Sequence, residues 1–147
     1  MKKYKIYTNN GIILSSDGYI NTSSYFKHNE NGPAYIVYQN HEIVFESYYV
    51  NNKLHREDGP AVINYSINGG LYYEMYCIDG NIHREDGPAH ISKLNGNTIH
   101  KFYINNKLHR TDGPAIIEYD NDNNIIHEYF YIYNKSLTKH QFIFNNL

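Results

Sequence analysis

The ten residues LHREDGPAVI, Leu54–Ile63, occur three times with little change. They return as IHREDGPAHI at Ile82–Ile91 and as LHRTDGPAII at Leu108–Ile117. All four prolines of the chain stand in a Gly-Pro-Ala tripeptide, and the intervals between them are 27, 28 and 26 residues. Proline directly before an apolar run is typical of the first residue of a strand, and so short a period indicates one supersecondary unit per repeat.

Two strands fit into each repeat. The run after Gly-Pro-Ala alternates and places isoleucine in one column. That column holds Ile36, Ile63, Ile91 and Ile117. The second run ends in an aromatic column with Tyr48, Tyr76, Phe102 and Phe130. Turns rich in Asn and Gly separate the runs, and these residues tolerate the left-handed conformation of tight turns. No segment keeps the i, i+3, i+4 pattern for the length of a helix.

The sequence therefore predicts an all-β fold with little or no helix, an antiparallel meander of tandem β-hairpin repeats in a twisted or curved sheet. We expect a single domain over 1–147, with an N-terminal β-hairpin cap over 1–25, repeats over 26–137 and a C-terminal edge over 138–147. Asn10-Gly11 is a strong hairpin signal for the cap. The apolar HQFIFNN at 140–146 predicts an edge strand suited to pairing with a second copy.

Composition limits the class of protein. A length of 147 residues suffices for a core without disulfides or metals, and the single cysteine excludes an intramolecular disulfide. The first twenty residues lack the apolar run of a signal peptide, and no run approaches the roughly 20 residues that cross a bilayer. The net charge of −2 gives no general attraction to DNA or anionic lipid. We expect a cytoplasmic protein that contacts neither membrane nor DNA.

The His-Arg-x-Asp-Gly-Pro-Ala loop has a structural interpretation. Loops of successive repeats should lie side by side, so that equivalent residues form ladders. An Asp side chain can hold the Asp-Gly-Pro turn, while Arg can bind a carboxylate of its own or a neighbouring loop. The residues assigned to this structural turn are Asp58, Gly59, Pro60, Asp86, Gly87, Pro88, Asp112, Gly113 and Pro114. Recurrence at every period favours this interpretation, because a ligand site normally occurs once.

The same loops carry an alternative, in which their cationic side chains capture an anionic nucleotide. The candidate residues are His55, Arg56, His83, Arg84, His109 and Arg110. Each Arg has a Glu or Asp within two residues, although Thr111 replaces Glu in the last copy, so the edge is not a basic patch.

The tyrosines that alternate with the core column form another candidate face. Tyr49, Tyr103 and Tyr131 predict either an exposed interaction surface or a second core. Signatures of enzymes are absent from the sequence: it holds no glycine-rich phosphate loop, nucleophile elbow or paired cysteines. A His-dependent hydrolase is therefore only a second alternative, and neither a metal nor a cofactor is expected.

The unit YYVNNKLHREDGPAVINY, Tyr48–Tyr65, resembles the HRxDGPA tandem repeats of uncharacterised proteins from giant viruses and bacteriophages. The resemblance covers about 26–137 and is more distantly similar to the MORN repeat, although the chain lacks Trp and so the Gly-x-Trp pattern. It implies a meandering antiparallel sheet and a viral protein in the host cytoplasm, and it assigns no catalytic residue or ligand. With the absent enzyme motifs, it predicts a non-enzymatic repeat module for protein–protein interaction or scaffolding.

Overall fold

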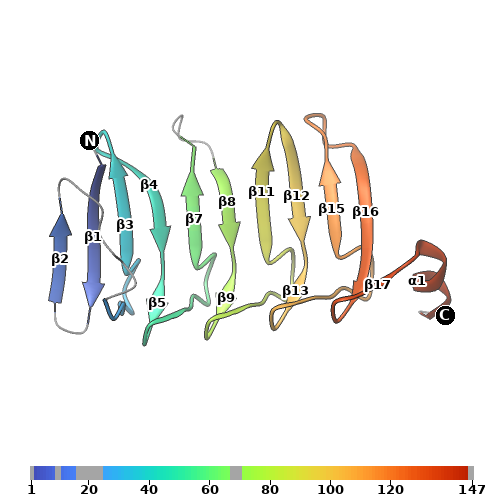
Figure 1. Ribbon diagram of the computed structural model, residues 1–147, viewed down its shortest axis with the longest axis horizontal. Coiled ribbons are helices and arrows are strands. Elements are labelled where there is room, and N and C mark those ends of the chain that lie inside the picture. Colours follow the sequence, from blue (N-terminus) through green and yellow to red (C-terminus); the bar gives the residue numbers. More distant parts are fainter. Residues whose placement is uncertain (1, 9–10, 16–24, 67–70, 146–147) are drawn as a thin grey trace. The chain divides into compact units, whose positions relative to one another are not determined.

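The computed structural model describes residues 2–8, 11–15, 25–66 and 71–145 (Figure 1). By its contacts the chain divides into two compact units, Met1–Gly80 and Asn81–Leu147, and each is described here by itself. The expectation of one domain over 1–147 stays a prediction. The all-β prediction is confirmed, because antiparallel meander sheets dominate both units and the described residues hold a single short helix.

The first unit contains a sheet in which strands consecutive along the chain are mostly neighbours. Its strands are β1 (Lys2–Thr8), β2 (Gly11–Ser15), β3 (Tyr35–Gln39), β4 (Glu42–Ser47), β7 (Val62–Tyr65) and β8 (Leu71–Met75). Their order is β2-β1-β3-β4-β7-β8, with antiparallel pairing throughout. Beside this sheet lie the short ladder of β5 (Tyr49–Val50) with β6 (Lys53–Leu54), and β9 (Cys77–Ile78).

The second unit repeats the plan. Its strands are β10 (Asn81–Ile82), β11 (His90–Leu94), β12 (Asn97–Lys101), β13 (Tyr103–Ile104), β14 (Lys107–Leu108), β15 (Ile116–Tyr119), β16 (Ile125–Ile132) and β17 (Lys135–Leu137). The main sheet has the antiparallel order β11-β12-β15-β16-β17, and β13 pairs with β14. The turns that join β3 to β4, β11 to β12 and β15 to β16 stand at one end of the long strands, whereas the Gly-Pro-Ala loops and the short ladders β5–β6 and β13–β14 stand at the other (Figure 1). The predicted turn at 67–70 lies outside the described residues.

The predicted second strand is interrupted in three of the repeats, which the sequence did not indicate. β4 ends at Ser47 and β5 begins at Tyr49, so Tyr48 belongs to neither. The reason is a change of hydrogen-bonding partner: the Tyr48 amide donates to the Ala61 carbonyl at 2.8 Å, and the Tyr48 carbonyl accepts the His55 amide at 3.1 Å. Equivalent bonds are made by Phe102, and β16 is the one second strand that runs without a break.

The alanine of each Gly-Pro-Ala tripeptide lies where the loop meets the second strand, and it is fully buried. The four residues, Ala34, Ala61, Ala89 and Ala115, have a relative exposure of 0%. The Ala34 amide donates to the Ser47 carbonyl at 2.9 Å, and the Ala61 amide to the Met75 carbonyl at 2.8 Å. A larger side chain would have to displace close-packed neighbours, which explains why the tripeptide ends in alanine in every repeat.

The N-terminal hairpin is more than a cover for an edge. β1 pairs with β3, and it also supplies the second strand that the first loop needs. The Tyr7 amide donates to the Ala34 carbonyl at 2.7 Å, and the Tyr7 carbonyl accepts the His28 amide at 3.2 Å. These are the bonds that Tyr48 makes in the next repeat, so β1 acts as half of an earlier repeat. The turn residue Asn10 and residues 16–24 lie outside the described residues.

The prediction of an edge strand at HQFIFNN is wrong, because Lys139–Asn145 forms helix α1. A capping box begins it: the Thr138 Oγ1 accepts the Gln141 amide at 3.2 Å, and the Gln141 Oε1 accepts the Thr138 amide at 2.9 Å. Buried Phe142 packs against Phe130 with ring centroids 4.8 Å apart. The sequence TKHQ carried the signal for this helix.

Candidate functional site

The arginine of each intact loop is bound within its own loop. Its Nε donates to the Oδ1 of the aspartate two residues later at 2.7 Å in all three copies, Arg56–Asp58, Arg84–Asp86 and Arg110–Asp112. Its Nη1 donates to the carbonyl of the loop proline at 3.4 Å in each copy. We call this arrangement, an arginine with its aspartate and proline carbonyl, the arginine clamp.

The guanidinium of the clamp also lies close to an aromatic ring and to the loop glycine. The Cζ of Arg56 lies 4.1 Å from the centroid of the Tyr48 ring, and that of Arg110 lies 4.0 Å from the Phe102 ring. A Cβ added at Gly59 would lie 3.0 Å from the Arg56 Cζ, and one at Gly113 would lie 3.2 Å from the Arg110 Cζ. A larger residue than glycine would therefore have to displace the guanidinium by a few tenths of an ångström.

The clamp distributes charge unevenly between the interior and the surface. The arginine side chains are 24 to 25% exposed, whereas their aspartate partners are 77 to 83% exposed. Hydrogen bonding to Arg56, Arg84 and Arg110 lowers the pKa of Asp58, Asp86 and Asp112 below its ordinary value, so the ionised carboxylate is favoured. The surface of an intact loop consequently carries more negative than positive charge.

The loop histidine holds the hairpin turn of the following repeat. In four repeats its Nδ1 accepts a backbone amide of that turn at 3.1 to 3.3 Å. The pairs are His28 with Asn51, His55 with Asp79, His83 with Asn105 and His109 with Tyr133. An Nδ1 that accepts a hydrogen bond leaves the ring proton on Nε2. The predicted histidine ladder is thus a set of structural acceptors within each unit.

The asparagines of these turns also form hydrogen bonds to the preceding repeat, whereas the sequence predicted only that they form turns. Both turn residues have positive φ, for example 49° at Asn51 and 62° at Asn52. The Oδ1 of the second residue also accepts an amide of the preceding repeat, from Lys27 to Asn52, from Ile82 to Asn106 and from Leu108 to Asn134. Gly80 holds this position in the remaining turn and keeps only the backbone bond, to the Leu54 carbonyl at 2.8 Å.

The first loop, His28–Ala34, has asparagine where the intact loops have the clamp residues. Asn29 replaces the arginine, and its Nδ2 donates to the Pro33 carbonyl at 3.1 Å. Its Oδ1 accepts the amide of Asn31, the residue in the aspartate position. This shorter side chain therefore reproduces the bond to proline but not the guanidinium that covers an aromatic ring.

Recesses lie between consecutive loops in both units, and we call them the interloop grooves. The first has a volume of about 670 Å³ and is lined by Asn29–Pro33, Tyr48, Val50 and His55–Asp58. The second has a volume of about 380 Å³ and is lined by Arg84–Gly87, Phe102, Ile104 and His109–Asp112. Each thus combines an aromatic and an aliphatic residue on its floor with charged loop residues on its rims.

The tyrosine face is less exposed than an interaction surface would be. Tyr49, Tyr103 and Tyr131 are all half-buried, and Cys77, which occupies the same column, is buried. Burial raises the pKa of Tyr49 and of Tyr103, and it raises the pKa of the Cys77 thiol to about 11. The Lys27 side chain, which is buried and has a lowered pKa for that reason, places its Nζ 5.1 Å from the centroid of the Tyr49 ring.

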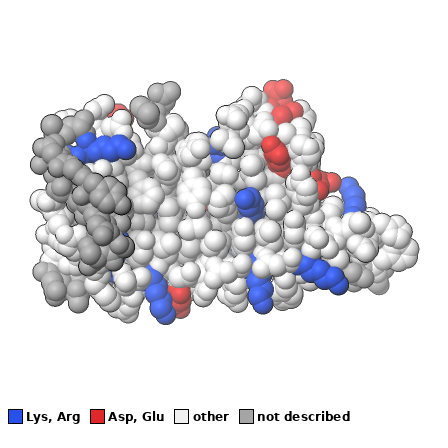
Figure 2. Space-filling view, in the orientation of Figure 1, with Lys and Arg blue, Asp and Glu red and all other residues white. Residues whose placement is uncertain are grey.

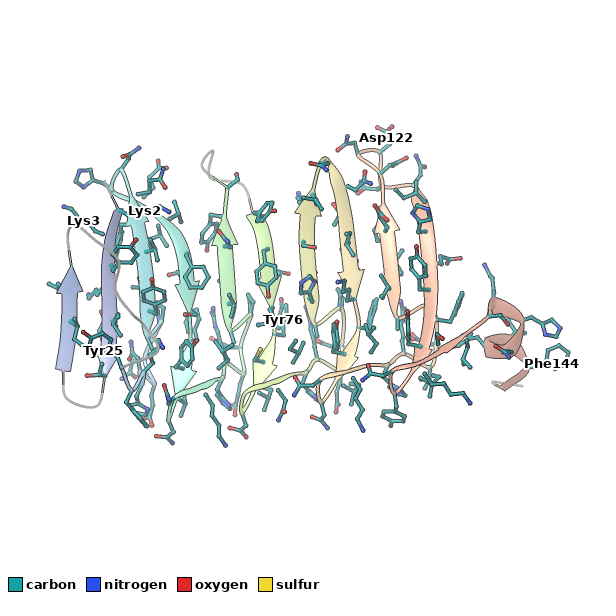
Figure 3. The ribbon with its side chains drawn as sticks, in the orientation of Figure 1. Lys2, Lys3, Tyr25, Tyr76, Asp122 and Phe144 are labelled. Carbon is teal, nitrogen blue, oxygen red and sulfur yellow. The ribbon has the colours of Figure 1, made fainter. Side chains whose placement is uncertain are left out.

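One histidine–carboxylate pair stands outside the repeat pattern. The Nδ1 of His127 lies 3.1 Å from the Glu118 Oε2, and the Glu118 Oε1 accepts the Asn97 amide group at 2.7 Å. These two contacts, with Asn97 first, lower the pKa of Glu118. Acidic side chains also gather at the turn between β15 and β16 in Figure 2, where Figure 3 labels Asp122. Within the described residues no three His, Cys, Asp or Glu side chains are grouped as metal ligands.

Comparisons of the chain with protein-family models, with curated proteins and with solved structures find no match. Among the described residues, no helix has the length and apolar character that crossing a membrane requires.

Proposed function

We propose that the chain is a non-enzymatic module for protein–protein interaction or scaffolding, which binds its partner along the loop ends of its hairpins. The observation that carries this proposal is that the arginine and histidine side chains of the loops already have hydrogen-bond partners within the chain. The clamp arginines bind aspartate and proline carbonyls, and the loop histidines accept backbone amides. Among the described loop residues, the two grooves with their exposed rims remain open to a partner.

The resemblance to HRxDGPA repeats extends the proposal to a viral protein that acts in the host cytoplasm, with a host protein or a sister virion protein as its partner. Capture of an anionic nucleotide receives less support. Such a ligand would need guanidinium N–H groups that the arginine's own loop does not already bind. It would also lie close to the exposed carboxylates of the same loops.

Selection of peptides against the full-length protein tests the proposed function. A random library of 12-residue peptides would be enriched on the immobilised chain, and the bound peptides would then be mapped by hydrogen–deuterium exchange. We expect protection of loop amides at 28–34, 55–61, 83–89 and 109–115. Failure to enrich any peptide, or protection confined to the opposite turns, would contradict the proposal.

A further inference from the structure

We propose that each interloop groove receives a basic side chain, Lys or Arg, from an extended segment of a partner protein. This inference rests on the proposed function and adds to it the chemistry of the partner. It comes from three features of the grooves: their floor, their charge and their width.

The floor suits the aliphatic part of a long side chain. In the first groove it is formed by Tyr48 and Val50, and in the second by Phe102 and Ile104. All four are half-buried, so each keeps some surface toward solvent. Lys and Arg bury their methylene stems on apolar surface while the charged group stays at the polar rim. An apolar side chain without a charged end would use the floor but not the rim.

The charge of the rims selects a cation. In the first groove Glu30, Glu57 and Asp58 have side chains that are 72 to 85% exposed, whereas Arg56 is 24% exposed and bound within its loop. Glu57 lies 3.8 Å from the His55 Nε2, which is too long for a hydrogen bond. In the second groove Glu85 is 84% exposed and 3.6 Å from the His83 Nε2. These glutamates therefore have oxygens available to an incoming ammonium or guanidinium.

The width of a groove suits a single extended chain. Two strands of the sheet lie between consecutive loops, and neighbouring strands are about 4.8 Å apart, so the rims stand on the order of 10 Å apart. The carboxylates of both rims are then within reach of one long side chain.

Fluorescence polarisation with defined peptides tests the inference on the full-length protein. The probes are three fluorescein-labelled nonapeptides of Gly and Ser that carry three Arg, three Lys or three Glu. We expect the Arg and Lys peptides to bind, with an affinity that falls as salt is raised, and the Glu peptide not to bind. Binding of the Glu peptide alone would overturn the inference and favour an anionic ligand.

Matched variants separate the grooves from general charge attraction. The double variant Glu57→Gln and Glu85→Gln should weaken binding of the Arg peptide at least about fivefold, whereas Glu42→Gln with Asp122→Asn, which removes the same charge at exposed sites outside the grooves, should leave it unchanged. Val50→Thr, which keeps the shape of the floor and makes it more polar, should also weaken binding. Equal losses in the two double variants would overturn the inference.

The two proposals fail in different ways. If the selected peptides protect the loops but carry no basic residues, the interaction module stands and the basic side chain is ruled out. If no peptide is enriched and neither basic probe binds, both proposals are contradicted.

Discussion

The first loop, His28–Ala34, and the intact loop His55–Ala61 follow the same backbone path with different side chains. In both, the alanine carbonyl accepts the amide of a tyrosine, Tyr7 or Tyr48, and the histidine amide donates to the carbonyl of that same tyrosine. The alanine amide donates to the carbonyl of Ser47 in the first loop and of Met75 in the intact loop. Only the intact loop has the arginine clamp; the first has Asn29 and Asn31. The backbone path of the loop is thus set by Gly-Pro-Ala and the strand with the aromatic residue. The clamp stabilises a loop that also forms without it.

Removing the clamp should have the largest effect. We expect Arg110→Ala to lower the free energy of unfolding by about 2 kcal/mol, because it removes a hydrogen bond to the partly buried Pro114 carbonyl, one to Asp112 and the stacking on Phe102. Asn29→Ala should cost about 1 kcal/mol or less, since it loses amide bonds alone. Urea unfolding of the two variants measures the difference, and equal costs would contradict the account of the clamp.

The loop glycines sharpen the same comparison. A Cβ at Gly113 would lie 3.2 Å from the Arg110 guanidinium carbon, whereas a Cβ at Gly32 would meet nothing closer than the Asn29 Nδ2 at 3.6 Å. We therefore expect Gly113→Ala to destabilise the protein by about 1 kcal/mol and Gly32→Ala to be close to neutral. Thermal unfolding of both variants measures this difference in stability. A neutral Gly113→Ala would show that the guanidinium is not held against the glycine.

The turn at Asp79-Gly80 offers a change in the opposite direction. Gly80→Asn should stabilise the protein by about 0.5 kcal/mol at most, because Asn tolerates positive φ better than other non-glycine residues and stands at this position in the other turns, while the φ of 84° offsets part of the gain. Its Oδ1 would also be placed to accept the Leu54 amide, by analogy with Asn106 and Ile82. The added Cβ would meet only Lys53 at 3.8 Å. A lower melting temperature would show that this turn differs from the others.

The smallest effect concerns pH. The pKa of the clamp aspartates is lower in the folded protein than in the unfolded chain, so the unfolded chain binds more protons as the pH falls below about 4. Their contribution to stability is therefore complete at neutral pH and is lost as the pH falls through the folded-state pKa. Asp112→Asn should make the acid dependence shallower. Asn31→Asp alone should leave it unchanged, whereas Asn31→Asp together with Asn29→Arg should make it steeper. Unchanged acid unfolding of Asp112→Asn would contradict this.

Much of the fold could be predicted because its signals are local and recur. The Gly-Pro-Ala tripeptides, the alternating runs and the Asn-rich turns placed the hairpins and the antiparallel meander. The structural interpretation of the loop also included a bond from Arg to a carboxylate, but it left open whether that carboxylate belongs to the same or to a neighbouring loop. These features recur in columns, so each copy supported the interpretation of the others.

What could not be predicted depends on contacts across the repeat. The break at Tyr48 results from bonds to Ala61 and His55, and the role of the His55 Nδ1 depends on a turn 24 residues away. Helix α1 was missed because FIF suggested a strand, although Thr138 and Gln141 form a capping box. In this helix Phe142 contacts the Phe130 ring, whereas in intact repeats an arginine contacts the equivalent aromatic ring. Figure 3 shows Phe144 at the outer end of the helix.

The most direct test is to build the clamp where the chain lacks it. Tyr7 has the backbone position of Tyr48, and Gly32 leaves room above the loop, so Asn29→Arg with Asn31→Asp should place a guanidinium over the Tyr7 ring. The account predicts a rise in the melting temperature of about 3 °C, corresponding to roughly 1 kcal/mol. It also predicts that Asn29→Arg alone gains less than the pair. A pair that melts at or below the temperature of the parent protein would contradict the claim that these charged residues are there to hold the loop.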